Sequence, residues 1–493
     1  MVQSRPEEEC NAGSLIEWLM NPSDYDAIVV GAGPNGLSAA IELARAGLAV
    51  GLLEAKGTIG GGARSSELTL PGYVHDICSA IHPMAVISPF FRSLPIEQHG
   101  VEWVHPPASL AHPFEDGSAA LLFRSVDETG QTLGADQKAY RNLMSPLVAN
   151  ADIIFNEILR PVRFPGRPFA MLHFGMNAVR SAAGLAASRF KEHRAKGLFA
   201  GCAAHSMLPL QKPGSGAIGL ALLLASHLAG WPFARGGSQK IADSLAAHLT
   251  NLGGEIQLEH PVDSIRDLPM PRCVLFDLTP RQVVSIANEQ LPSSYSRKLS
   301  RFRYGPGSFK VDWALNGPIP WKAAECLLAA TVHVGGRMEE IMASEDAAWN
   351  GRHSERPFVL VAQHTLFDST RAPAGKHTGW AYCHVPHGSS MDMTEKIEMQ
   401  IERFAPGFRD LIIARHTYSA IELERHNPNL IGGDIGGGAN DLWQFIARPV
   451  LRFDPYATPN RSLYICSSST PPGGGIHGMC GYWAARSALR GVF

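Results

Sequence analysis

Three glycines near the start of the chain have the spacing of a phosphate-binding turn. Gly31, Gly33 and Gly36 form the pattern G-x-G-x-x-G between an apolar run, residues 27–30, and an apolar stretch, residues 37–46. In a strand–turn–helix unit the first glycine permits the tight turn, the second lets the backbone approach a pyrophosphate, and the third lets helix and strand pack closely. The amino end of the helix presents N–H groups and a partial positive charge to the phosphates. The spacing therefore predicts dinucleotide binding.

An acidic residue and a second glycine cluster follow, and together they favour FAD over a nicotinamide. The next predicted strand, residues 48–53, ends at Glu54, where a carboxylate suits the hydroxyl pair of a ribose. A glycine cluster that includes Gly61 comes directly afterwards, and Arg64 follows it. We predict that Gly61 lets the backbone approach the pyrophosphate and flavin, and that the Arg64 guanidinium pairs with phosphate oxygens. A surface position for Arg64 is the alternative.

Both ends of the chain are similar to flavin-binding signatures of one superfamily. Residues 31–64 resemble the N-terminal FAD motif of the phytoene desaturase and amine oxidase superfamily, and residues 462–485 resemble the C-terminal flavin motif of carotenoid-desaturase-like proteins. Several internal stretches resemble the subgroup named for pyridine nucleotide-disulfide oxidoreductase domain-containing protein 2: residues 230–238, 310–315, 371–377 and 382–386. The resemblance implies that the cofactor is FAD. It also implies that the backbone of Val262 contacts the adenine, and that the flavin is contacted by Gly474, Gly475 and Ile476.

Two positions depart from that resemblance. Ser467 and Ser468 stand where many relatives carry Gly-Asp or Gly-Ala, so the aspartate that holds the flavin's ribityl chain is missing. A backbone N–H or a serine hydroxyl must replace it. Pro471 stands where the subgroup tends to have histidine, which casts doubt on a role for a histidine at that position.

The fold class that we predict is α/β, with a Rossmann-type FAD-binding domain of the glutathione-reductase-like kind interleaved with an α+β substrate domain. A chain of 493 residues is too long for one ordinary domain. The expected segments are an N-terminal extension (1–23), three FAD-domain parts (24–110, 231–285 and 456–493) and two substrate-domain parts (111–230 and 286–455). Helices are predicted over 138–159, 176–196 and 239–252, and strands over 309–315, 358–363 and 378–384.

Composition excludes several functions. The net charge of −2 gives no electrostatic basis for nucleic-acid binding, and no histidine spacing typical of a metal site occurs. None of the eight cysteines forms C-x-x-C, so we expect no disulfide reductase activity. No second G-x-G-x-x-G that directly follows an apolar strand run lies between the FAD-domain parts, which favours electrons that come from an organic substrate and leave to oxygen, a quinone or another acceptor.

The candidates for proton transfer or contact with the flavin ring are His82, Tyr382 and His477, with His377 and His384 as further histidines of the same kind. A hydrogen-bonded structural role is the commoner alternative for each histidine. Three tryptophans are expected in the core, with the lining of an apolar pocket as the alternative: Trp231, Trp313 and Trp380.

The function that we predict is an FAD-dependent oxidoreductase that desaturates a small apolar, isoprenoid or lipid-like substrate by hydride transfer to flavin N5. A redox-neutral isomerase, a saturase using reduced flavin, and a flavin-binding regulatory protein are the alternatives. We expect a cytoplasmic protein without a signal peptide, because the N-terminus lacks a basic segment followed by an apolar one. Residues 216–230 are too short to span a bilayer and are expected as a buried helix, with a tunnel wall or peripheral membrane contact as alternatives.

Overall fold

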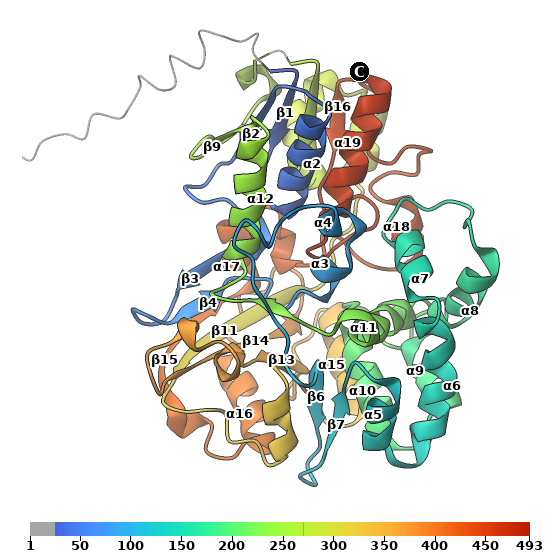
Figure 1. The fold of residues 1–493 in the computed structure, drawn as a ribbon, viewed down its shortest axis with the longest axis vertical. Coiled ribbons are helices and arrows are strands. Elements are labelled where there is room, and N and C mark those ends of the chain that lie inside the picture. The colour runs from blue at the N-terminus through green and yellow to red at the C-terminus, as the bar shows by residue number, and fades with distance from the viewer. Residues whose placement is uncertain (1–24, 270) are drawn as a thin grey trace, which may run out of the picture.

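The computed structural model describes residues 25–269 and 271–493, so the predicted N-terminal extension lies outside the described residues. Two large sheets carry the fold. A parallel sheet with helices lies at the top of Figure 1, a mixed sheet lies below it, and a layer of helices flanks the mixed sheet.

The parallel sheet has the strand order β16-β10-β1-β2-β9. Its strands are β1 (Ala27–Val30), β2 (Val50–Leu53), β9 (Glu255–Gln257), β10 (Cys273–Phe276) and β16 (Leu463–Ile465). Every residue of β1, β2, β10 and β16 is buried, which explains why these strands are continuous apolar runs in the sequence. Three helices cover one face of this sheet (Figure 1): α2 (Pro34–Arg45), α12 (Gln239–Asn251) and α19 (Met479–Gly491).

Strands from three distant parts of the chain thus share one sheet, as an interleaved Rossmann-type fold requires. The predicted helix over 239–252 is α12. The predicted α/β class is confirmed; the domain boundaries stay predictions.

The mixed sheet has seven strands in the order β15-β11-β14-β13-β12-β6-β7, and only β12 and β6 pair in parallel. Its strands are β6 (Leu110–Pro113), β7 (Ala119–Leu122), β11 (Gly307–Leu315), β12 (Thr331–Val334), β13 (Val359–Ala362), β14 (His377–Val385) and β15 (Ile412–Tyr418). The strands predicted over 309–315, 358–363 and 378–384 are β11, β13 and β14, so all three predictions are confirmed.

The two long helices predicted beside this sheet are interrupted. The stretch 138–159 is divided into two helices, α6 (Gln137–Val148) and α7 (Ala151–Ile158). Asn150 leaves helical geometry between them, and its side-chain amide donates to the carbonyl of Pro146. A local hydrogen bond of this kind competes with the helix and ends it.

The stretch 176–196 lies in three helices, α8 (Pro168–Ala178), α9 (Ala182–Arg189) and α10 (His193–Ala204). The Ser181 hydroxyl caps α9 by accepting the N–H of Gly184. The Asp136 carboxylate, distant in sequence, accepts the N–H groups of Lys191 and Glu192 just before α10. Apolar spacing alone does not reveal these caps, which explains why one continuous helix was the wrong prediction.

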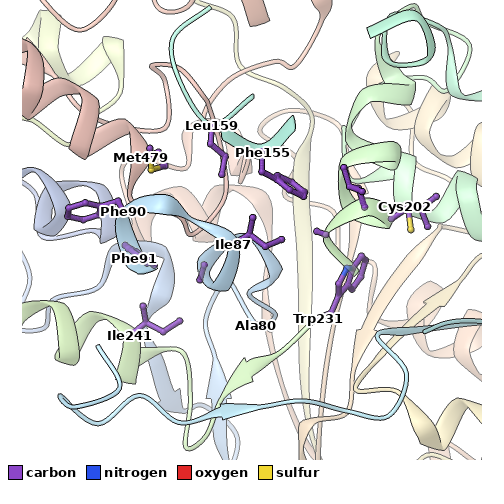
Figure 2. Close-up of a cluster of buried hydrophobic side chains, with 14 of the residues drawn as sticks. Ala80, Ile87, Phe90, Phe91, Phe155, Leu159, Cys202, Trp231, Ile241 and Met479 are labelled. Carbon is purple, nitrogen blue, oxygen red and sulfur yellow. The ribbon is translucent and has the colours of Figure 1, made fainter. Parts of the chain in front are cut away.

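One hydrophobic core joins the helices of the parallel sheet to the helical layer. Figure 2 shows Phe90 and Met479 on one side of this core and Trp231 and Cys202 on the other. The apolar segment 216–230 forms the buried helix α11 (Ser215–Ala229), as predicted. Among the described residues, the structure contains no helix with the length and apolar character that a membrane crossing needs.

Candidate active site

A cavity of about 330 Å³ lies between the glycine turn of the parallel sheet and the mixed sheet. Gly33 and Gly61 line it on the Rossmann side, and Trp380 and Tyr382 of β14 line it on the other. The wall is completed by a C-terminal loop that includes Gly475. Segments predicted to bind the cofactor therefore meet at the same space as residues of the mixed sheet.

The glycine turn between β1 and α2 has no room for side chains. A Cβ atom added to Gly36 would lie 1.9 Å from the carbonyl oxygen of Gly31, and one added to Gly33 would lie 2.6 Å from an oxygen of Asp277. Gly31 has a φ of +101°, which favours glycine. Gly61 packs on Gly33, because a Cβ there would lie 3.1 Å from the Cα of Gly33. The turn therefore has the close-approach geometry that a pyrophosphate-binding backbone needs.

Glu54 and Arg64 form an ion pair beside this turn. Arg64 Nη2 lies 3.1 Å from Glu54 Oε1, and the guanidinium also donates to the carbonyl of Thr58. The other carboxylate oxygen accepts the N–H of Ala32 at 2.9 Å. Both side chains are buried, and the structure shows their contacts with each other; their contacts with ribose and phosphate stay predictions. Val262 is buried after β9, on the same side as Glu54, and its contact with adenine likewise stays a prediction.

The C-terminal flavin motif closes the cavity from the opposite end of the chain. Gly475 and Ile476 line the cavity, whereas Gly474 packs under the loop 432–438, where an added Cβ would lie 2.7 Å from the carbonyl oxygen of Gly436. Ser467 and Ser468 also line it, and Asn35 Nδ2 donates to Ser468 Oγ at 3.3 Å. The Ser468 hydroxyl therefore lies beside the first turn of α2, and its contact with a ribityl chain stays a prediction.

Asp277 is a site residue that the sequence analysis missed. It follows β10, lines the cavity, and accepts the N–H of Gly36 at 2.9 Å through Oδ2. Burial raises the pKa of Asp277 well above its usual value, the charge of Glu54 adds to this effect, and the hydrogen bond from Gly36 opposes it. The parallel pairing of β1 with β10 brings Asp277 to the glycine turn, and no local sequence signal shows that pairing.

The three predicted catalytic residues lie in different surroundings. His82 and Tyr382 line the cavity, whereas His477 does not. The His82 ring contacts the Ser79 hydroxyl at 2.8 Å, and burial lowers its pKa to about 4. His477 Nδ1 accepts the N–H of Met479 at 3.0 Å, so this ring caps the start of α19. Burial raises the pKa of Tyr382. Catalytic roles for all three stay predictions.

The further histidines lie behind the cavity wall or away from it. His377 contacts Thr365 Oγ1 at 3.1 Å, and His384 contacts Glu345 Oε2 at 2.8 Å. A histidine that the sequence analysis did not single out, His205, does line the cavity, and its Nε2 lies 3.0 Å from Nε2 of His333. Burial lowers the pKa of His205 to about 3, so the ring is neutral near neutral pH.

An apolar and aromatic floor faces the glycine turn. Trp380 and Tyr382 lie two residues apart on β14, with their rings 5.3 Å apart in an edge-on arrangement. Their cross-strand neighbours on β13, Ala362 and Leu360, line the same cavity. Trp231 and Leu222 supply a second apolar wall from the helical layer. Trp231 and Trp380 therefore line an apolar pocket, which was the alternative to a position in the core. Trp313 is buried in a separate core.

A network of buried charges lies under the aromatic floor. Lys310 pairs with Asp312, and its ammonium lies 5.9 Å from the centre of the Trp380 ring. The Trp380 indole donates to the carbonyl of Asp76 at 2.8 Å, and the Asp76 carboxylate accepts from Arg371 at 2.6 Å. These side chains are almost completely buried, so they fix the floor from behind.

Cys78 lines the cavity as an unpaired thiol. Burial raises the pKa of Cys78 to about 11, which keeps it protonated near neutral pH. Its burial and high pKa suit an inert wall residue.

Comparisons with known proteins agree with this geometry. Residues 29–94 match the family described as an NAD(P)-binding Rossmann-like domain. Pyridine nucleotide-disulfide oxidoreductase domain-containing protein 2 of Mus musculus is 25% identical, with 95% of this chain and 94% of that protein covered. One of the subunits of limonene dehydrogenase from Castellaniella defragrans is 22% identical, with 94% of each covered. Phytoene desaturase (neurosporene-forming) of Rhodobacter capsulatus is 26% identical, with 50% of this chain and 51% of that protein covered.

Solved structures share the fold. An oxidoreductase from Methanosarcina mazei aligns with a TM-score of 0.63 at 16% identity, covering 94% of this chain and 99% of that one. A triple mutant of putrescine oxidase aligns with a TM-score of 0.60 at 16% identity, covering 94% and 98%. Fold and site thus define a Rossmann-type oxidoreductase. By sequence the chain is homologous to oxidoreductases, and to the mouse protein over nearly its full length; it shares its fold with putrescine oxidase.

Proposed function

We propose that the protein is an FAD-dependent dehydrogenase of an apolar substrate. The observation that carries this proposal is one cavity whose two sides differ in chemistry. Its Rossmann side is the glycine turn at the start of α2, and its other side is the floor formed by Trp380, Tyr382 and Leu360. The first side suits a phosphate-linked cofactor, and the second suits a carbon skeleton with few polar groups.

The residues present fit FAD. Gly33 and Gly61 place no side chain of their own in front of α2, and the side chain that borders this space is Asp277, whose carboxylate accepts the N–H of Gly36. The amino end of α2 faces the same space, where its partial positive charge suits a phosphate. Gly475 and Ile476 would hold the ring end from the C-terminal loop, and the hydroxyl of Ser468 would take the place of the missing aspartate at the ribityl chain.

The chemistry would be divided between cofactor and protein. A bound flavin supplies the capacity to accept a hydride at N5 from a substrate carbon. The walls of the cavity hold the carbon skeleton against the ring and exclude water, which reduces the entropic part of the barrier. Burial keeps His82 and Tyr382 uncharged near neutral pH, so each can orient a substrate by hydrogen bonding without placing a charge in the apolar space.

The names of two relatives support an apolar substrate. One belongs to a limonene dehydrogenase and another is a phytoene desaturase, and limonene and phytoene are both isoprenoid hydrocarbons. We infer that this chain also removes hydrogen from an isoprenoid or lipid-like molecule. With a flavin bound, oxygen or a quinone would be the electron acceptor.

Anaerobic mixing tests the direction of the reaction. The FAD-loaded protein is mixed with candidate isoprenoid hydrocarbons, and the flavin absorbance near 450 nm, a general property of oxidised flavins, is followed. Bleaching by the substrate alone supports dehydrogenation, and admission of air or a soluble quinone then identifies the acceptor by the faster return of colour. Turnover that needs a flavin reduced beforehand would contradict dehydrogenation and favour an isomerase or a saturase.

A further inference from the structure

Large apolar side chains project into solvent from two segments on one side of the helical layer. In the first segment, Phe164 is 85% exposed, Phe169 88% and Met176 55%. The second segment contains α18 (Leu442–Ala447) and the residues after it, where Trp443 is 68% exposed and Phe453 is fully exposed. We call these two segments, residues 162–179 and 442–453, the apolar face. Exposed apolar groups at this density mark an interaction site.

The two segments are neighbours in space. The N–H of Gly214 donates to the carbonyl of Val179, just after α8, at 3.0 Å. A Cβ added to the same glycine would lie 3.6 Å from the Cβ of Leu442, at the start of α18. Figure 1 shows α8 and α18 on the same side of the molecule, next to α7.

The charges around the apolar face are positive. Residues 159–181 contain four arginines and no aspartate or glutamate. Residues 442–453 contain no acid and one exposed arginine, Arg452, because Arg448 is buried. Of the acids that flank the two segments, Glu157 contacts Arg163 at 3.3 Å and Asp441 contacts Arg303 at 2.6 Å. Asp454, directly after the second segment, accepts the Ser487 hydroxyl and the N–H of Tyr456. A surface of projecting aromatic rings among arginines is complementary to an apolar layer beneath negative headgroups.

We propose that the apolar face docks the protein on the surface of an anionic phospholipid membrane. Protruding rings such as Phe164 and Trp443 would enter the boundary between headgroups and acyl chains, and the arginines would contact phosphates. The binding is peripheral, because it uses loops and the short helices α8 and α18 rather than a spanning segment. Docking does not depend on the proposed cofactor or reaction.

The buried helix α11 links this face to the cavity. At its start, a Cβ added to Gly216 would lie 3.1 Å from the carbonyl oxygen of Arg180, directly after the first segment. Near its middle, Leu222 lines the cavity, and its carbonyl accepts the indole N–H of Trp231 at 3.2 Å. A docked protein would therefore hold one end of α11 at the membrane and the middle of the same helix at the site, which suits a substrate that is dissolved in lipid.

Vesicle flotation of the full chain tests the proposal. Wild-type protein is mixed with vesicles of phosphatidylcholine alone, or of phosphatidylcholine with phosphatidylglycerol, at low and high salt. We expect binding to the anionic vesicles, and we expect it to weaken with added salt. Arg167→Gln should lower the partition coefficient about fivefold, and Phe169→Asp combined with Trp443→Asp should lower it more than about tenfold.

The matched control is Met399→Asp, because Met399 is 54% exposed on α16 (Thr394–Phe404), outside the apolar face. This variant should bind vesicles like the wild type. Equal flotation of the Phe169→Asp, Trp443→Asp variant and the wild type would overturn the proposal. Absence of vesicle binding, together with a dimer that dissociates in the same double variant by light scattering, would overturn it in favour of self-association. Both readouts need no substrate and no activity, so they are separate from the test of the proposed function.

Discussion

Asp277 places an ionisable carboxyl group at the glycine turn of the candidate site. Its Oδ2 accepts the N–H of Gly36, and burial raises its pKa well above the usual value. The carboxylate of Glu54 is the other charge that raises this pKa, and the backbone N–H groups of Gly36 and Gly33 act in the opposite direction. A protonated Asp277 would tolerate a pyrophosphate nearby, whereas an ionised one would repel it.

The affinity for FAD is therefore expected to fall as pH rises through the pKa of Asp277. The sign follows from linkage: a bound anion raises this pKa further, so binding takes up a proton and weakens when protons become scarce. Asp277→Asn should bind FAD like the wild type at low pH and about tenfold more tightly above the pKa. Flavin fluorescence titrations over a pH series measure this effect. The exposed Asp410→Asn is the control, and an unchanged pH dependence in Asp277→Asn would refute the assignment.

At the scale of elements, Arg371 joins three segments behind the cavity floor. Its guanidinium donates to Asp76 at the end of β4 (Val74–Asp76), to Asp368, and to the carbonyl of Ala234 in β8 (Phe233–Ala234). The side chain is completely buried. Because the Trp380 indole donates to the backbone of Asp76, this ion pair also fixes the aromatic floor.

Arg371→Met should therefore lower the free energy of unfolding by about 3–5 kcal/mol, since it leaves the buried Asp76 without an arginine partner and Asp368 with Arg235 alone. Chemical denaturation compares this variant with Arg352→Met, which removes an ion pair to Asp346 on the surface and should cost less than about 1 kcal/mol. Equal stabilities of the two variants would show that the buried network does not support the floor.

At the scale of the whole molecule, many histidines are buried in the neutral form. Burial lowers the pKa of His82, His112, His227 and His477 from the ordinary 6.5 to about 4, and that of His205 and His364 to about 3. The unfolded chain binds protons at these side chains near pH 6.5, whereas the folded chain does so only at lower pH.

Stability should therefore fall as pH decreases from about 6.5 towards about 4, by up to about 2 kcal/mol per buried histidine at about pH 5. The loss has this sign because the unfolded state takes up more protons than the folded state in that window. Thermal unfolding over this pH range measures it. His82→Asn removes one such group, so the free energy of unfolding should decrease less over this pH range. An identical pH dependence would mean that folding does not lower the pKa of His82.

Local runs of residues predicted much of the fold, because β1, β2 and β10 are buried on both faces and are apolar throughout. The side of the cavity that holds Gly33 and Gly475 was likewise predictable, since each lies in a local glycine pattern. The aromatic floor could not be predicted in this way. Trp380 faces the cavity because β14 pairs with β13 in the register that places Trp380 opposite Ala362, and this pairing is not visible in the local sequence.

The same limit applies to charged residues. The sequence predicted Arg64 as a phosphate ligand but did not show its ion pair with Glu54, which forms only when the glycine loop folds back. Asp277 was missed because it reaches Gly36 through the pairing of two strands more than 200 residues apart, a contact that no local pattern records.

The most direct test of the central claim is the titration of cofactor-free protein with FAD, followed by absorbance and by quenching of flavin fluorescence. The account predicts saturable binding of one FAD per chain, and loss of that binding in Gly33→Val, because a side chain there would fill the space in front of α2. A correctly folded wild-type protein that stays colourless with FAD would contradict the account, and so would a Gly33→Val variant that retains FAD fully.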